Sequence, residues 1–177
     1  MDPRIQTKFH EVIGAHGPRA GRVLEIGGLL GPKSLLLFSE LENTERFLIN
    51  LSSLKSSSGV QTVQGNSNDM PNFVSDSFDL VMSNAVLEHD KYFWKSIAEM
   101  KRILKPGGLM IIGVPGYAVL PTDKGISTPT FKIHFSVDYY RFSPQAVTDV
   151  FFENMSDVEH EIMLRPPRII AWGRKPV

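Results

Sequence analysis

The sequence has no cysteine, no net charge and no long apolar run, and each absence excludes a class of function. Without cysteine the chain forms no disulfide, and 177 residues suffice for a hydrophobic core without one. Nineteen basic and nineteen acidic side chains cancel, which argues against a nucleic-acid partner or electrostatic binding to a membrane. No apolar segment approaches the roughly 20 residues that cross a bilayer, and no signal-like stretch follows Met1, so we expect a cytoplasmic protein.

Clustered metal ligands and internal repeats are also missing from the sequence. We therefore expect no metal and a single domain over residues 1–177. Within it, residues 1–21 form a leading helix and linker. Residues 115–142 show little periodicity and contain several glycines and prolines, which is typical of a lid or acceptor-binding segment.

Short apolar segments alternate with amphipathic ones along the chain, which is the pattern of an α/β protein. The predicted strands are residues 23–26, 47–51, 60–63, 78–82, 109–114, 158–164 and 168–172, and the predicted helices are residues 4–14, 32–43, 92–104 and 143–155. Only about eight residues separate the second and third strands, so either any helix there is reduced to a turn or two or the third strand is displaced. The alternation predicts a doubly wound, mostly parallel sheet with helices on both faces and a ligand at the carboxyl ends of the strands.

The most informative segment is RVLEIGGLLG, at residues 22–31. An apolar run ends in Glu25 and opens at once into Gly27, Gly28 and Gly31. An extended segment that turns sharply without Cβ atoms exposes backbone N–H groups to a nucleotide-like ligand. The segment therefore suggests a cofactor site, although glycine-rich turns after strands serve many ligands.

The order of motifs resembles the class I S-adenosylmethionine-dependent methyltransferases, in their small type 11-like form. The motifs are VLEIG (residues 23–27), GNSNDMP (65–71), SFDLV (77–81), VLEH (86–89) and RILKPGGL (102–109). Together they extend the resemblance over roughly residues 20–175. It implies a Rossmann-like sheet of seven strands in the order 3-2-1-4-5-7-6, with the last strand antiparallel, and S-adenosyl-L-methionine as cofactor.

The resemblance also implies which residues bind that cofactor. Residues after the first strand would line its methionine and ribose part, those after the second and third strands its ribose and adenine, and those after the fourth strand its transferable methyl group. The implied set is Glu25, Gly27, Gly28, Gly31, Asn50, Leu51, Asn66, Ser67, Met70, Ser83 and Asn84.

Three positions depart from the family pattern. Leu29 stands where a glycine is expected, and Asn50 and Asn66 stand where the family usually has acids. A carboxylate accepts from two hydroxyls at once, whereas a carboxamide offers one acceptor oxygen and one donor nitrogen. Each replacement costs on the order of 1 kcal/mol of cofactor affinity. The alternative is that both asparagines only end strands or cap turns.

The implied chemistry is displacement at a sulfonium methyl, for which the protein must hold a nucleophile in line. A hydroxyl acceptor needs a base, and the candidates are His89 and His134, whereas a carboxylate acceptor needs none. The alternative for His89 is a packing and hydrogen-bonding role.

The segment HFSVDYYRFSP, at residues 134–144, resembles one found in methyltransferases encoded with glycan or surface-polysaccharide functions. It mixes aromatic side chains with His, Asp and Arg, which suits an acceptor pocket. The candidate acceptor-binding residues are Tyr117, Asp138, Tyr139, Tyr140 and Arg141. The alternative is that aromatic residues anchor the segment to the core while Arg141 forms a structural ion pair.

Three functions remain open at this point. The first is a methyltransferase acting on a small molecule, most plausibly on an oxygen of a sugar or related metabolite, as a monomer or homodimer. The second is a dinucleotide-dependent dehydrogenase, which the spacing of Gly27, Gly28 and Gly31 disfavours because it is not G-x-G-x-x-G. The third is a methyltransferase-like ligand-binding or partner module without catalysis, which Leu29, Asn50 and Asn66 favour.

Overall fold

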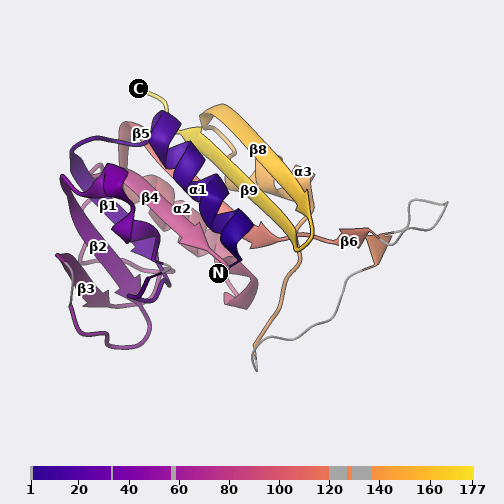
Figure 1. Cartoon of the computed structure of the whole chain (residues 1–177), viewed down its shortest axis with the longest axis horizontal. Helices are drawn as coiled ribbons and strands as arrows, with labels where there is room; N and C mark the ends of the chain where they lie inside the picture. The colour runs from indigo at the N-terminus through magenta and orange to yellow at the C-terminus, as the bar shows by residue number, and fades with distance from the viewer. Residues whose placement is uncertain (1, 33, 57–58, 120–126, 129–136) are drawn as a thin grey trace.

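Seven strands form one mixed sheet in the order β3-β2-β1-β4-β5-β9-β8 (Figure 1). The computed structural model describes residues 2–32, 34–56, 59–119, 127–128 and 137–177. The strands are β1 (Gly21–Ile26), β2 (Thr44–Asn50), β3 (Val60–Gln64), β4 (Phe78–Asn84), β5 (Leu104–Pro115), β8 (Ser156–Leu164) and β9 (Pro167–Arg174). Strands β1 to β5 pair in parallel, and β9 is antiparallel to β5 and to β8. The predicted strand order and antiparallel last strand are confirmed.

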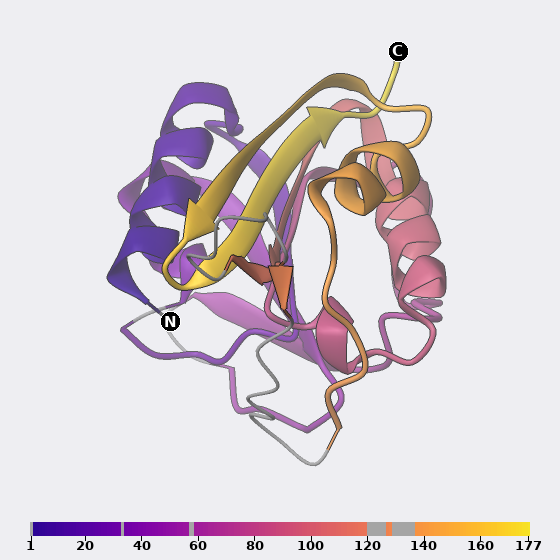
Figure 2. The same ribbon diagram turned by 90° about the vertical axis from the view of Figure 1, so that its right-hand side faces the viewer.

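Period-two alternation sends neighbouring residues of each strand to opposite faces of the sheet. In β1, Val23 packs with the cluster under α1 (Pro3–His16), and Leu24 packs with the cluster under α2 (Phe93–Ile103). Figure 2 shows these two helices on opposite sides of the sheet. The fold therefore has three layers, with one apolar cluster on each face.

A side-chain cap begins helix α1. Asp2 precedes it and accepts from the Arg4 N–H at 2.9 Å, and Pro3 occupies the first turn. The buried residues of the helix are Ile5, Phe9, Val12 and Ile13, which recur at three- and four-residue steps. The helix thus covers its face of the sheet with one apolar stripe.

The predicted helix over residues 32–43 is wrong. Two 3₁₀ turns, η1 (Leu35–Leu37) and η2 (Ser39–Leu41), stand in its place. Phe38 has extended backbone angles and ends η1, and its ring packs edge-on against His10 of α1 at 5.0 Å. Leu35 and Leu36 are buried there as expected, but Leu37 is exposed and Phe38 is only partly buried, because two short turns do not present one continuous apolar face.

The last helical segment begins as predicted and ends early. The Ser143 hydroxyl accepts from the Ala146 N–H at 3.0 Å at the start of α3 (Pro144–Ala146). The chain then widens into the π-helical turn η4 (Val147–Phe151), several residues short of the expected end. Between β2 and β3, none of the described residues is helical, in agreement with the expected reduction.

The segment expected to form a lid lies only partly within the described residues, and His134 lies outside them. Two short strands that the sequence did not predict, β6 (Ala118–Val119) and β7 (Ser127–Thr128), pair antiparallel beyond the end of β5. Figure 1 shows β6 projecting away from the sheet. In the described part of the chain, no helix is long and apolar enough to cross a membrane.

Candidate functional site

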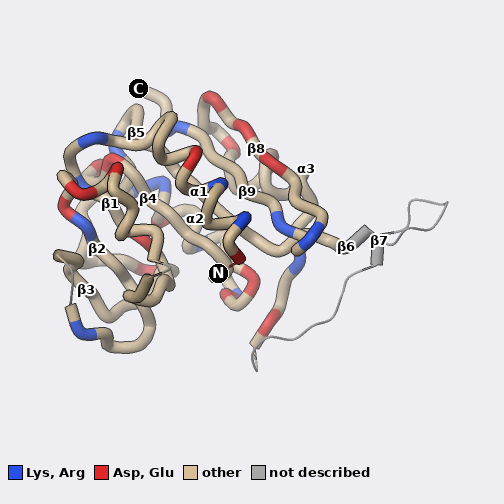
Figure 3. Tube along the Cα trace, viewed as in Figure 1, with Lys and Arg blue, Asp and Glu red and all other residues tan. Residues whose placement is uncertain are grey.

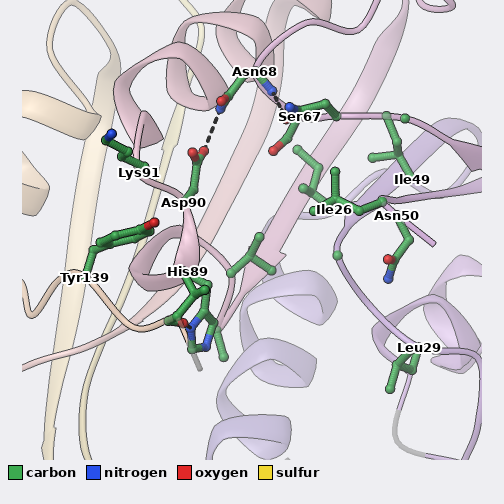
Figure 4. A pocket seen from close by; sticks show the side chains of 17 residues that line it. Ile26, Leu29, Ile49, Asn50, Ser67, Asn68, His89, Asp90, Lys91 and Tyr139 are labelled. Carbon is green, nitrogen blue, oxygen red and sulfur yellow. Dashed lines mark hydrogen bonds between the residues drawn. The ribbon is translucent and has the colours of Figure 1, made fainter. Parts of the chain in front are cut away.

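A cavity of about 480 Å³ lies at the carboxyl ends of β1, β2, β3 and β4. Its lining residues are Ile26, Gly27, Leu29, Ile49, Asn50, Leu51, Gly65, Asn66, Ser67, Asn68, Ala85, Val86, His89, Asp90, Lys91, Val137 and Tyr139. Its volume falls in the range of small-molecule sites, and its place is where open α/β sheets bind ligands. In Figure 4, Asn50 and Leu29 lie on one side of the cavity, and His89 and Tyr139 lie on the other.

The glycines after β1 have different structural roles. Gly27 has φ +71°, and a Cβ there would lie 2.5 Å from Cγ2 of Val86. A Cβ on Gly28 would lie 2.4 Å from Cδ of Glu25, whereas Gly31 has open space around it. Gly27 is the only one of the three that lines the cavity. Its bare backbone therefore forms part of the wall that the sequence assigned to a cofactor.

Glu25 lies behind that wall. Its side chain is buried and accepts from the Ser34 hydroxyl at 3.2 Å. Burial raises the pKa of the carboxyl from its ordinary value of 4.5 to about 7, against the opposing effect of the Ser34 hydrogen bond. Glu25 lies beneath the Gly28 turn and next to the backbone of η1. It does not line the cavity.

Five other expected cofactor residues also lie away from the cavity wall. Met70 is buried in the core cluster under α2, because its side chain points back into the sheet layer. Ser83 is buried within β4, and the Oδ1 atom of Asn84 faces Gly113 of β5. Gly28 and Gly31 complete the set that does not line the cavity, whereas Gly27, Asn50, Leu51, Asn66 and Ser67 do.

A hydrogen-bond network at one end of the cavity was missed in the sequence. Nδ2 of Asn68 donates to Oδ2 of Asp90 at 2.6 Å (Figure 4) and to the Ser96 hydroxyl at 2.8 Å. The Ser96 hydroxyl also lies 2.7 Å from that of Ser67. Asn68 and Asp90 were not singled out, because an asparagine in a turn and an acid before a helix are common caps.

His89 lies across the cavity from Asn50 and Leu29, in η3 (Leu87–His89). Its Nδ1 atom contacts the Val137 carbonyl oxygen, and because a carbonyl only accepts, Nδ1 carries the proton. In the neutral ring, Nε2 then carries the lone pair, 3.9 Å from Oε1 of Glu88. His89 therefore lines the cavity with the Glu88 carboxylate near its Nε2 atom.

Of the residues expected to bind an acceptor, Tyr139 lines the cavity and three others support it. Asp138 and Arg141 form a bidentate ion pair, with the second N–O distance at 2.8 Å. The Tyr140 hydroxyl donates to the Lys91 carbonyl at 2.9 Å, and its ring packs on that of Phe93 at 5.0 Å. These contacts hold the segment beneath Tyr139.

Tyr117 is exposed and is not among the lining residues. Among the described residues, no group of three or more His, Asp or Glu side chains could hold a metal ion. The polar groups at the cavity are thus amides, hydroxyls, one imidazole, one carboxylate and one ammonium.

Residues 37–112 match the family model described as a methyltransferase domain. No curated protein matches the sequence of the chain.

Solved structures share the fold of this chain at low sequence identity. Phosphoethanolamine N-methyltransferase 2 of Haemonchus contortus, in complex with S-adenosyl-L-methionine, gives a TM-score of 0.74 at 17% identity over 97% of this chain. This chain spans 53% of that enzyme. The 1,6-didemethyltoxoflavin-N1-methyltransferase of Burkholderia thailandensis, with bound S-adenosylhomocysteine, gives 0.71 at 15% identity over 99% of this chain and 80% of that one.

A third similar structure belongs to a protein complex. The complex between the Haloferax volcanii Trm112 methyltransferase activator and a putative methyltransferase gives a TM-score of 0.67 at 17% identity. The match covers 97% of this chain and 95% of that one. The fold is therefore shared by proteins whose substrates and assemblies differ.

Proposed function

We propose that the protein is an S-adenosylmethionine-dependent methyltransferase that acts on a small molecule, most plausibly on an oxygen of a sugar or related metabolite. The observation that carries the proposal is the cavity at the carboxyl ends of β1 to β4, with the bare backbone of Gly27 in its wall. The family match covers the segment from η1 to β5 that builds most of this cavity. The single-domain organisation and the acceptor-binding role of residues 115–142 belong to the same proposal.

The residues present fit the cofactor. Gly27 leaves room that a Cβ would fill, Ile26 and Ile49 give apolar walls, and Ser67 and Asn68 offer polar atoms at one end. When bound, S-adenosylmethionine supplies an electrophilic methyl group. In the proposed site, Gly27, Leu51, Asn66 and Ser67 hold the cofactor, and Asn50 lines the cavity beside them.

His89 is the proposed base for a hydroxyl acceptor. Val137 fixes the proton on Nδ1, so Nε2 takes the proton of the acceptor hydroxyl. The resulting imidazolium has the Glu88 carboxylate 3.9 Å away, which stabilises its charge. Tyr139 forms the acceptor side of the cavity, and Asp138, Tyr140 and Arg141 position it.

Binding and turnover test this function separately. Calorimetry with S-adenosylhomocysteine should show one site in the wild type and none in Gly27→Val, whose side chain would collide with Val86. Gly31→Val is the matched control, because nothing lies within 4 Å of a Cβ there. Transfer of labelled methyl from S-adenosylmethionine into metabolite extracts then tests catalysis, and His89→Ala should lower turnover with an unchanged cofactor Kd.

The second candidate is a ligand-binding or partner module without catalysis. It is favoured by Leu29, whose side chain is 70% exposed and lies at the cavity where the family has glycine. Ligand binding by Leu29→Gly and not by the wild type would support this candidate over the enzyme. The Haloferax complex with an activator supports a test for a protein partner in that case.

A further inference from the structure

Asn50 ends β2 at the cavity, and its carboxamide is already engaged at both ends. Nδ2 donates to the Gly28 carbonyl at 3.0 Å, and Oδ1 accepts from the Ser52 N–H at 3.1 Å. The first bond reaches across to the turn after β1, and the second closes a local turn after β2. One side chain thus ties together the two loops that border the cavity on this side.

A second bond reinforces this tie through the backbone. The Gly27 N–H donates to the Ile49 carbonyl at 2.8 Å, one residue before Asn50. The turn at Gly27 and Gly28 is therefore joined to the end of β2 by one backbone and one side-chain hydrogen bond. Holding a bare-backbone turn in a fixed position lowers the reorganisation needed when a ligand binds against it.

The carboxamide cannot also act as a two-site acceptor for a pair of hydroxyls. Oδ1 has two lone pairs, of which the Ser52 N–H takes one, and Nδ2 is a donor only. A vicinal diol needs two acceptor sites from one side chain if a single residue is to accept both protons. Asn50 has one remaining acceptor site and so lacks that capacity.

We propose that Asn50 is a positioning residue, which fixes the Gly28 turn against the end of β2 and does not itself discriminate a ribose from a deoxyribose. The inference rests on the proposed function, since its ligand is the nucleoside part of the cofactor. Asparagine suits this position better than aspartate, because a carboxylate oxygen would face the Gly28 carbonyl oxygen at the present 3.0 Å contact.

A cycle of two proteins and two ligands tests the assignment. Calorimetry measures S-adenosylhomocysteine and its 2′-deoxy analogue against the wild type and Asn50→Ala. A positioning role weakens both ligands by the same factor, about tenfold for the two bonds lost, so that the ratio of the two Kd values stays within about twofold. Loss of affinity for the ribose ligand alone would overturn the proposal, because it would mean direct contact with the 2′-hydroxyl.

A positioning residue and a direct diol acceptor predict opposite changes in ligand affinity for Asn50→Asp. We expect it to weaken both ligands, since the tie to Gly28 is lost, whereas a direct diol acceptor would bind more tightly as a carboxylate. Gln64→Glu is the matched control: Gln64 pairs with Asn50 in the sheet and donates to the Leu51 carbonyl at 3.1 Å, but does not touch the Gly28 turn. Equal effects of the two substitutions would contradict the assignment.

Amide hydrogen exchange without ligand separates failure of this inference from failure of the proposed function. The Ser52 N–H should exchange faster in Asn50→Ala than in the wild type, and at the wild-type rate in Gln64→Glu. If the wild type binds no S-adenosylhomocysteine, the proposed function fails, and the exchange of Ser52 still decides whether Asn50 fixes the loop. Unchanged exchange in Asn50→Ala would overturn the positioning role itself.

Discussion

Two buried carboxylates, Glu25 and Glu88, flank the cavity without lining it. Glu25 supports the turn after β1 through Ser34 and η1. Glu88 accepts from Arg168 at 3.3 Å through Oε1, and its backbone carbonyl accepts from the Tyr139 N–H at 2.7 Å. Glu25 therefore supports the cavity wall through its side chain, whereas Glu88 holds Tyr139 through its backbone carbonyl.

Glu25 gives the protein a pH-dependent stability. Because its pKa rises to about 7 on folding, the folded state binds more protons than the unfolded state between pH 4.5 and 7. The free energy of unfolding should fall as pH rises through this window, by on the order of 3 kcal/mol, and level off above it.

Urea denaturation of the wild type and Glu25→Gln at pH 5 and pH 8 measures this effect. Glutamine keeps an acceptor for the Ser34 hydroxyl and has no charge to bury. The difference in stability between the two pH values should therefore shrink in the variant. The same difference in both proteins would remove Glu25 as its source.

At the scale of elements, α2 couples the cavity to the core. Its buried residue Ser96 reaches Asn68 and Ser67 after β3 and Asp90 before the helix. The same buried face of the helix packs Ile97, Met100 and Ile103 on the sheet. Displacement of α2 would therefore move one end of the cavity.

Ser96→Ala should destabilise the protein by about 1 to 3 kcal/mol, because Asn68 and Asp90 each lose a partner in a half-buried network. Urea denaturation measures the loss. Lys95→Ala, an exposed neighbour in the same helix, should change stability by less than about 0.5 kcal/mol. Similar losses of stability in both variants would show that the network does not stabilise the protein.

A cluster of aromatic rings anchors the segment that carries Tyr139. Phe93 lies within 5.3 Å of the rings of Tyr140, Phe142 and Phe151, measured between centroids. Of these, Phe151 is fully buried. The acceptor side of the cavity thus depends on packing between α2, η4 and residues 137–142.

Phe151→Ala should cost about 3 to 5 kcal/mol by leaving a cavity in this cluster. Phe151→Leu, which keeps much of the volume, should cost less. Chemical denaturation orders the two variants, and near-ultraviolet circular dichroism reports loosening of the aromatic rings. Equal stability of the alanine variant and the wild type would contradict the packing described here.

Over the whole molecule, charge is dispersed and the stability lies in two apolar layers. Figure 3 shows acidic and basic residues distributed along the described chain, consistent with the zero net charge of the sequence. One layer contains Phe9 and the other contains Phe78, both fully buried. Each layer covers only one face of the sheet, so both are needed to bury it.

Removing one large side chain from the α1 layer should weaken the whole fold. Phe9→Ala is expected to lower the free energy of unfolding by about 3 to 5 kcal/mol. Thr7→Ala changes the exposed side of the same helix and should have little effect. A small effect of Phe9→Ala would mean that α1 is separable from the sheet.

The strands and their order were predictable because each strand has its own apolar run and the motifs follow one another in a known order. The helix types were not predictable, because the pattern of Leu35, Leu36 and Leu41 is compatible with burial in a helix and in two 3₁₀ turns. Of the residues that the sequence analysis expected at a cofactor site, Gly27, Asn50 and Ser67 line the cavity, so the place of the cavity at the strand ends was predictable. The positions of the Glu25 and Asn84 side chains away from the cavity were not predictable, because a motif does not encode which way a side chain turns at the end of a strand.

Strand β9 lies between β5 and β8 although it follows both in the chain. During synthesis on the ribosome, β5 emerges with one hydrogen-bonding edge unpaired, and β8 has no neighbour to join until residues 167–174 appear. An open edge next to an apolar surface invites pairing with other nascent chains. The edge of β5 is therefore paired only once β9 inserts between β5 and β8.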